Sequence, residues 1–315
     1  MRRRNFLKQS AIAGIAATSI TKAFGMVPYT EKGKVLINFG ICTDLHHDLI
    51  KDGEKRLQAF IEEMNQLKPH FIIQTGDFCM PKEKNRPLME IWDQFKQPSY
   101  HVLGNHDTDG GFTHDQVITF WKATGKYYSF DQNGYHFVVL NGNERPQGDT
   151  SQAYPRSIGK EQINWMKKDI ENTRLPVIIF CHQGIDNDQD GIKEGSLIRL
   201  IFERLNQKAG FNQIRLVFSG HHHEDYHNIY NNIHYIQINS MSYQFSHAEA
   251  GDGYASTKDP LWAYVSIYDN GIIKIKGKKS VYPNPENQHS AAGYNGYPTV
   301  PYISDRIISL RGDQP

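Results

Sequence analysis

Five short apolar segments of this 315-residue chain each lead directly into a group of Gly, Asp, Asn or His residues. Short, uninterrupted apolar runs are typical of strands that are buried on both faces. The five predicted strands span residues 35–41, 71–74, 100–103, 177–181 and 215–218. Segments with helical spacing of apolar residues separate several of these strands. This order of elements predicts an α/β protein built from βαβ units.

The remaining elements follow from periodicity and turn residues. Helices are predicted at residues 54–68, 88–96, 115–124, 160–171 and 196–208, the last with Ser196 as its N-cap. Hairpins are predicted around residues 131–134 and 269–271, and a further strand at residues 234–238. With 38% hydrophobic and 22% charged residues, one globular domain over residues 30–280 is expected. Residues 281–315, rich in Pro, Gly and Tyr, are expected to wrap the surface of that domain.

Side chains that can bind metal ions stand just after each predicted strand. Ligands of α/β sheets collect outside the carboxyl ends of the strands, so these separate segments can converge on one place. Carboxylate, amide and imidazole donors suit Zn, Fe, Mn, Co or Ni. The candidates exceed what one ion usually takes from a protein, and two ions about 3.5–4 Å apart that share a carboxylate would fit them. They are Asp44, His46, Asp77, Asn105, His182, His221 and His223.

The N-terminus has the character of a targeting segment. Arg2 to Arg4 precede Phe6, Leu7 and Lys8, and a short, weakly apolar run follows at residues 11–20. This pattern predicts a signal peptide at residues 1–25, too short to span a bilayer as a helix. The paired arginines resemble the bacterial twin-arginine motif, with an ordinary secretory signal as the alternative. The protein is therefore expected to be exported to the periplasm.

Charge and cysteine content restrict the partners. The formal net charge is +1, and loss of residues 1–25 would remove five basic and no acidic residues, leaving −4. A long nucleic acid is therefore not an expected partner. No Cys lies near the predicted cleavage point, so no lipid anchor is expected to hold the mature chain to a membrane. The three cysteines do not form a disulfide framework, and the sequence leaves the oligomeric state open.

Five ordered motifs resemble those of the calcineurin-like metallophosphoesterases, over residues 35 to about 235. They are Asp44-Leu45-His46, Gly76-Asp77, Gly104-Asn105-His106-Asp107, His182 and Gly220-His221-His222-His223. The resemblance implies an αββα four-layer sandwich of two mixed β-sheets flanked by helices. It also implies a metal-dependent phosphoric ester hydrolase with two metal ions, Fe, Mn or Zn, at the edge of the sheets. A small phosphate ester would be the substrate.

The resemblance also implies a role for each residue. Asp44, His46 and His223 would hold one metal, Asn105, His182 and His221 would hold the other, and Asp77 would bridge them. His106 would protonate the leaving group, and Asp107 would orient His106. Asn105, His106 and His222 are the residues expected to contact substrate. Met80 stands where many members have an acidic residue or Tyr, which argues against the tyrosinate-ligated iron type.

The chemistry expected at such a site is an in-line attack on phosphorus. Two divalent ions outweigh the charges of Asp44, Asp77 and a bridging hydroxide by one positive charge, which attracts a phosphate oxyanion. The hydroxide would attack phosphorus, and His106 would act as general acid because an alkoxide leaves poorly at neutral pH. The sequence leaves open whether monoesters or diesters are preferred.

Other functions fit parts of the same sequence. His223-Glu224-x-x-His227 matches the zinc-protease pattern, which requires a helix through both histidines. A nucleotide pyrophosphatase or nuclease of the same fold is a second alternative. A non-catalytic, metal-binding scaffold is a third, although such a protein is expected to lack some ligands, and none is missing here.

Overall fold

The computed structural model describes residues 33–187, 189–245, 253–283 and 297–310. The predicted signal peptide therefore lies outside the described residues, as do parts of the Pro/Gly/Tyr-rich tail. Within the described part, no helix is both long and apolar enough to pass through a lipid bilayer.

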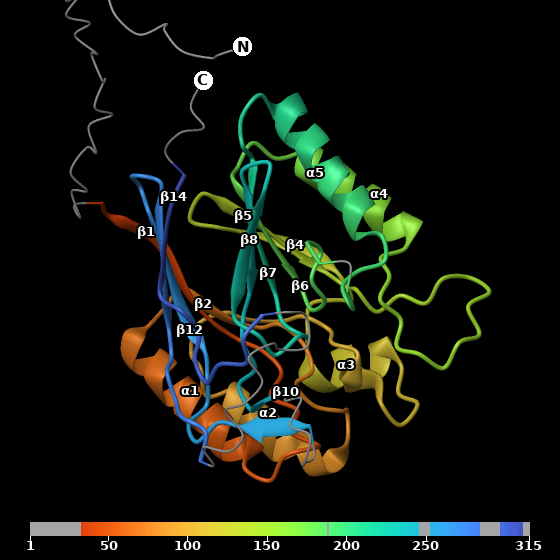
Figure 1. The fold of residues 1–315 in the computed structure, drawn as a ribbon, viewed down its shortest axis with the longest axis vertical. Helices are drawn as coiled ribbons and strands as arrows, with labels where there is room; N and C mark the ends of the chain where they lie inside the picture. The colour runs from red at the N-terminus through yellow and green to blue at the C-terminus, as the bar shows by residue number, and fades with distance from the viewer. Residues whose placement is uncertain (1–32, 188, 246–252, 284–296, 311–315) are drawn as a thin grey trace, which may run out of the picture. The chain divides into compact units, whose positions relative to one another are not determined.

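Two six-stranded mixed sheets form the centre of the domain (Figure 1). The first has the order β14-β13-β12-β1-β2-β3 and the second β4-β5-β6-β7-β9-β8. The strands of the first sheet are β1 (Val35–Cys42), β2 (Phe71–Gln74), β3 (Ser99–His101), β12 (Ala263–Tyr268), β13 (Ile272–Gly277) and β14 (Arg306–Ser309). Those of the second are β4 (Tyr128–Gln132), β5 (Tyr135–Leu140), β6 (Val177–Cys181), β7 (Ile214–Ser219), β8 (Tyr226–Tyr230) and β9 (Ile233–Gln237). A separate pair is formed by β10 (Tyr243–Phe245) and β11 (Tyr254–Ser256).

The two sheets pack face to face through aromatic side chains. The ring of Phe39 on β1 stacks on Phe71 of β2 at 4.8 Å between centroids. Its edge contacts Phe137, Phe180 and Phe218 of the second sheet at 5.8–6.1 Å. All five rings are fully buried, and such edge-to-face contacts add to the free energy gained from burying apolar area. This aromatic core fixes the sheets relative to each other.

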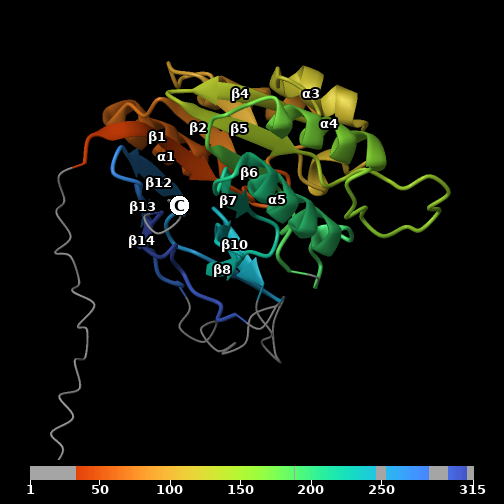
Figure 2. The ribbon, with the colours of Figure 1, turned by 90° about the horizontal axis from the view of Figure 1, so that it is seen from above.

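Helices cover the outer faces of the sheets (Figure 2). Buried side chains of α1 (Gly53–Leu67), α2 (Arg86–Trp92) and α3 (His114–Trp121) pack on the first sheet, and those of α4 (Lys160–Glu171) and α5 (Gly195–Ala209) pack on the second. Short 3₁₀ helices precede α2 at Glu83–Asn85 and follow β3 at His106–Thr108. The four layers confirm the predicted αββα sandwich.

Several elements differ in detail from their predictions. Ser196 is not the N-cap of α5, because the helix begins at Gly195 after Glu194, and the Ser196 hydroxyl instead accepts a hydrogen bond from Arg199. The apolar periodicity of the sequence does not predict β8, β10, β11 or β14. The last of these comes from the Pro/Gly/Tyr-rich tail, where Arg306–Ser309 pairs antiparallel with β13 and forms one edge of the first sheet.

Parallel pairing brings the carboxyl ends of strands together. β1, β2 and β3 are parallel in the first sheet, and β5, β6, β7 and β9 are parallel in the second. Backbone hydrogen bonds join the loops that follow these strands: Asp44 N donates to Gly76 O at 3.0 Å, and Gly220 N donates to His182 O at 2.9 Å. The loops with the predicted metal ligands therefore converge on one region.

Candidate metal centre

Five of the predicted ligands have left-handed backbone conformations. The φ angles are 54° at Asp44, 50° at His46, 51° at Asp77, 74° at His221 and 55° at His223. Positive φ is uncommon for residues other than Gly, and such conformations cluster at functional sites, where the surrounding structure holds them in place. Each sits in a loop after a strand, so these sharp turns direct the side chains to the edge of the sandwich.

The side chain of Asp44 lies at the meeting point of three imidazoles. Its Oδ1 is 3.2 Å from Nε2 of His223, 3.7 Å from Nε2 of His46 and 3.9 Å from Nε2 of His182. Nε2 of His46 is also 3.0 Å from Nε2 of His223. All four side chains are almost fully buried. The prediction placed Asp44, His46 and His223 on one ion, and the ligand atoms of these three residues lie within 4.8 Å of one another.

Asp77 lies between this group and a second one. Its Oδ2 is 3.2 Å from Nε2 of His182 and 3.6 Å from Nε2 of His46. The rings of His182 and His221 are 5.1 Å apart, and Asp77, His182 and His221 bring one ligand atom each within 4.8 Å of one another. His46, Asp77 and His106 form a third such group. Asp77 thus stands where a carboxylate shared by two ions is expected.

Three of the candidate ligand atoms lack a hydrogen-bond partner. Oδ1 of Asp44, Oδ1 of Asn105 and Nε2 of His182 are buried and have no hydrogen-bond partner of acceptable geometry among the described residues. A buried polar atom without a partner is costly, and a bound cation removes that cost. The residues present therefore fit a two-ion centre of carboxylate, amide and imidazole ligands.

Outer contacts hold two of the imidazoles in register. Nδ1 of His182 is 2.7 Å from Thr75 O, and Nδ1 of His223 is 2.6 Å from Tyr243 O. A proton on Nδ1 that is donated to a carbonyl leaves Nε2 as the metal-binding atom, a common arrangement around protein-bound metals. No sequence pattern predicts this role of Tyr243, because any residue type can supply a backbone carbonyl as hydrogen-bond acceptor.

Charge interactions inside the cluster favour ionised carboxylates. Burial opposes ionisation of Asp77, but the neighbouring His182 outweighs it and lowers the pKa of Asp77. Burial also disfavours a charged imidazole at His182, but Asp77 and Asp44 raise the pKa of His182 to about 9. Burial lowers the pKa of His221 and His46. A metal ion bound at His182 would therefore displace a proton, and its affinity would rise with pH.

His106 occupies the more open side of the cluster. Its backbone N–H donates to Oδ1 of Asp77 at 2.8 Å, which ties the residue to the predicted bridging carboxylate. Nδ1 of His106 is 2.7 Å from Oδ2 of Asp109 and 3.1 Å from the hydroxyl of Tyr154. The Tyr154 hydroxyl donates to the other oxygen of Asp109 at 2.9 Å. Asp109 and Tyr154 together hold the imidazole.

Asp107 has a different place from the one predicted. The carboxylate accepts from the backbone N–H groups of Gly104 (2.7 Å), Phe78 (2.7 Å) and Asp77 (3.1 Å), so both of its oxygens are used away from the His106 ring. Burial and the charge of Asp77 raise the pKa of Asp107, against the effect of these amides. Asp107 joins the two loops that follow β2 and β3, and Asp109 is the carboxylate beside His106.

The sequence did not predict the two residues that contact the His106 ring, Asp109 and Tyr154, and only one of them could have been found from its position. Asp109 lies three residues after His106 at the end of the short 3₁₀ helix, so its spacing was a usable signal. Tyr154 lies in a segment without helix or strand, and no sequence signal pointed to it. His222, predicted to contact substrate, is 1% exposed, and its Nδ1 is 2.9 Å from the Tyr226 hydroxyl. That burial does not support substrate contact at His222.

The zinc-protease alternative is wrong. It requires a helix through His223 and His227, but His227 lies on β8, an antiparallel partner of β9. Nε2 of His227 is 2.9 Å from Nδ1 of His234 on β9. The His227 ring is therefore not part of the cluster of candidate ligands. His223 and His227 therefore cannot share one ion in the way that pattern requires.

Comparisons with known proteins indicate the family of this chain. The family model of the calcineurin-like phosphoesterases matches residues 37–225. The mouse (Mus musculus) serine/threonine-protein phosphatase CPPED1 is 29% identical over 194 residues, 55% of this chain and 60% of its own length. The chain thus matches less than two thirds of that relative. A 3′,5′-cyclic-nucleotide phosphodiesterase from Nostoc sp. is 21% identical over 266 residues, 80% of this chain and 96% of that protein.

Solved structures support the fold. A dimetal phosphatase from Danio rerio superposes with a TM-score of 0.60 at 12% identity, over 78% of this chain and 96% of its own. GAP50, described as the anchor in the inner membrane complex of Plasmodium, has a TM-score of 0.57 at 15% identity, over 88% of this chain and 90% of its own. At such identities the likeness concerns the fold alone. The family match, which covers more than half of the chain and includes all of the clustered ligands, shows that this protein belongs to the calcineurin-like phosphoesterase family.

Proposed function

We propose that this protein is a metal-dependent hydrolase of small phosphate esters. The carrying observation is the cluster itself, in which neighbouring buried carboxylate and imidazole atoms from four separate loops lie 3.0–3.9 Å apart. Oδ1 of Asp44, Oδ1 of Asn105 and Nε2 of His182 are buried there without a hydrogen-bond partner among the described residues. Two metal ions bound there would supply a Lewis acid for the phosphate and a hydroxide nucleophile at neutral pH. Asp44, His46 and His223 would hold one ion, Asn105, His182 and His221 the other, and Asp77 both.

His106 is the proposed general acid. Its side chain is 32% exposed, whereas the imidazoles of His46, His182 and His223 are at most 2% exposed, so His106 is better placed than these three to meet a substrate. The neighbouring carboxylate of Asp109 contacts Nδ1 and fixes the orientation of the ring. Delivery of a proton to the departing oxygen is typically worth about 10²–10⁴ in rate.

Phosphate ester class and cellular location are parts of the same proposal. The relatives are named as a phosphatase and as a phosphodiesterase, which supports the reaction but leaves monoester and diester substrates equally open. The negative charge expected for the mature chain supports a small substrate rather than a long nucleic acid. The twin-arginine-like N-terminus supports export to the periplasm as a folded protein.

The test separates metal binding from proton transfer. Purified protein is assayed for bound Fe, Mn and Zn and for hydrolysis of matched aryl phosphate mono- and diesters. Asp77→Ala is expected to lose both metal and activity, and His106→Ala is expected to keep the metals and lose turnover. His227→Ala is the matched control, because His227 lies on β8 outside the cluster. Loss of metal in His106→Ala would contradict its role as acid.

A non-catalytic scaffold remains the competing function. The fold does not decide between the two, since one structural neighbour is described as an anchor. What favours an enzyme is that the six carboxylate and imidazole candidates gather in overlapping groups beside the part-exposed imidazole of His106. Bound metal without hydrolysis of either ester class would favour the scaffold.

A further inference from the structure

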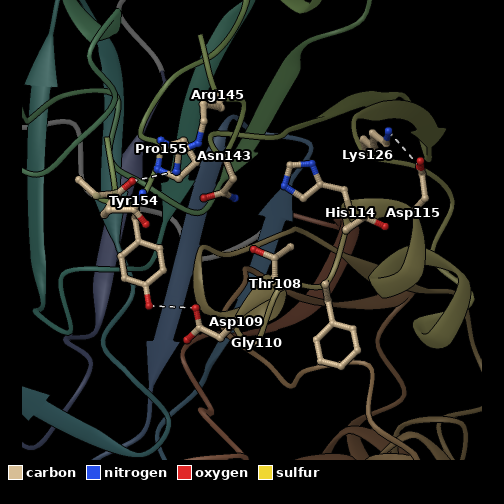
Figure 3. Close-up of a pocket in the computed structure, with 15 residues that line it drawn as sticks. Thr108, Asp109, Gly110, His114, Asp115, Lys126, Asn143, Arg145, Tyr154 and Pro155 are labelled. Atoms are coloured by element: carbon tan, nitrogen blue, oxygen red, sulfur yellow. Dashed lines mark hydrogen bonds and ion pairs between the residues drawn. The ribbon is translucent and has the colours of Figure 1, made fainter. Parts of the chain in front are cut away.

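A cavity of about 770 Å³ lies next to His106 and has no role in the function proposed above. Asp109 and Tyr154, the two residues that hold the His106 ring, both line it. Figure 3 shows Tyr154 and Asp109 meeting at one side of the cavity, with Lys126 paired to Asp115 at another. Asp109 also lines a smaller cavity together with His46 and His106. The large cavity therefore adjoins the reaction centre on the side of the proposed general acid.

We propose that this cavity is the subsite for the leaving group, and that it takes a neutral alcohol with a ring. The inference rests on the proposed hydrolysis of phosphate esters. A general acid must touch the leaving oxygen, so the remainder of the leaving group extends past His106, where the cavity opens. The volume lies within the range of about 300–1,000 Å³ found for small-molecule pockets.

The charges of the lining favour a neutral ligand. Nζ of Lys126 is 2.9 Å from Asp115, and Nη1 of Arg145 is 3.4 Å from Asp149. Arg145 also donates to the carbonyls of Ser151 and Ala153. Each cation in the lining thus has a partner already, and an anionic leaving group would have to break one of these contacts. A neutral group meets no such cost.

Aromatic and polar surfaces in the lining favour a ring with hydroxyl or other polar groups. Phe112 and Tyr154 supply ring surface, and burial lowers the pKa of His114, which keeps that imidazole neutral. At Gly111, a Cβ atom would meet nothing within 4 Å, so the backbone leaves the rim of the cavity open. A flat ring can lie against such a wall and still reach hydrogen-bonding groups.

The experiment compares two substrates that differ only in a ring. Ethyl phosphate and 2-phenylethyl phosphate, or the corresponding diesters if the enzyme prefers these, have leaving alcohols of similar acidity. The metal-loaded protein is expected to prefer the phenylethyl ester by about tenfold in kcat/KM, the lower end of what burial of a few carbon atoms provides. Phosphate release measures both rates.

Two variants act on the cavity in opposite ways. Ala153→Trp fills part of the cavity with an indole ring from an exposed position and should abolish the preference for the phenylethyl ester. Phe112→Ala removes an aromatic ring from the lining and should reduce this preference several-fold. Tyr230→Ala, which removes a 43% exposed ring from β8 away from the cavity, should leave the preference unchanged. Ala153→Trp serves as the test even if Phe112→Ala fails to fold.

The outcomes separate the subsite from the function. Equal kcat/KM for the two esters, unchanged in Ala153→Trp, would overturn the subsite and leave the hydrolase intact. Absence of hydrolysis of any ester by the metal-loaded protein would overturn the proposed function and the subsite with it. A preference for the ring that is also lost in Tyr230→Ala would place the ring elsewhere and likewise overturn the subsite.

Discussion

Asparagine substitutions at Asp107 and Asp109 are expected to affect different properties of the protein, although both residues lie within three positions of His106. The Asp107 carboxylate accepts hydrogen bonds from three backbone N–H groups inside the core, and Asp109 contacts the His106 ring at the surface. Asp107→Asn should therefore affect stability, and Asp109→Asn should affect proton transfer. The motif resemblance alone implies the reverse assignment, so the pair of variants tests the structure directly.

The cost of Asp107→Asn follows from its contacts. If the amide oxygen takes the place of Oδ2, the new NH₂ group faces the N–H of Phe78, which is left buried without an acceptor. One lost hydrogen bond and one buried N–H left unpaired together cost about 3 kcal/mol. For a domain of this size, about 2 °C of melting temperature is lost per kcal/mol, so the metal-free protein should melt about 6 °C lower.

Asp109→Asn should barely change stability, because the pair is part-exposed, with the side chains 25% and 32% exposed at Asp109 and His106. Pairs of that kind contribute less than about 1 kcal/mol. The loss appears in catalysis: kcat for an ethyl ester should fall about tenfold or more, since an alkoxide needs the acid. For a 4-nitrophenyl ester, whose phenolate leaves unaided, kcat should change by less than about threefold.

The assay is a thermal melt together with phosphate release from both esters, each with the wild type and the two variants. A merely structural role for Asp109 would lower both rates alike, so the dependence on the leaving group is the decisive readout. If Asp107→Asn instead gave the leaving-group-dependent loss with an unchanged melting temperature, the assignment made from the contacts of these two carboxylates would be wrong.

Three further predictions concern other parts of the chain. Gly76 has φ of +102°, and a Cβ there would press on the His182 ring, so Gly76→Ala should lower the bound metal measured by elemental analysis without unfolding the protein. Burial opposes the charge on His136, but the carboxylates of Asp169 and Asp131 outweigh it and raise the pKa of His136. The charged imidazole therefore stabilises the folded protein below about pH 6.5, and this stabilisation is lost as the pH rises through the folded pKa. His136→Asn should therefore cost on the order of 1 kcal/mol in urea unfolding at pH 6 and less at pH 9. Replacement of Arg3 and Arg4 by Lys should retain the precursor in the cytoplasm on fractionation, and unchanged export would exclude the twin-arginine route.

The candidate metal ligands could be identified in the sequence because each follows one of the five predicted strands. Apolar runs identify β1, β2, β6 and β7 from the sequence, and the rule that ligands collect at the carboxyl ends of such strands does the rest. Their left-handed backbone angles could not be foreseen, since they depend on hydrogen bonds between loops, such as that from His46 N to Asp77 O at 2.8 Å. Short strands such as β10 and β14 were missed for a related reason. Three or four residues give too little periodicity, and pairing with a neighbour creates the strand.

The contacts around the His106 ring could not be predicted from the sequence. The motif around Asn105 predicts an imidazole near the metals, but not which carboxylate supports it, because adjacent acidic residues point in different directions on a short 3₁₀ turn. Tyr154 is 48 positions from His106 in the chain and reaches it only through the fold. The candidate ligands thus follow predicted strands, whereas the residues that contact the His106 ring and line the adjoining cavity come mostly from irregular segments. Differences in substrate among relatives should therefore map to residues 108–115 and 143–155 rather than to the metal ligands.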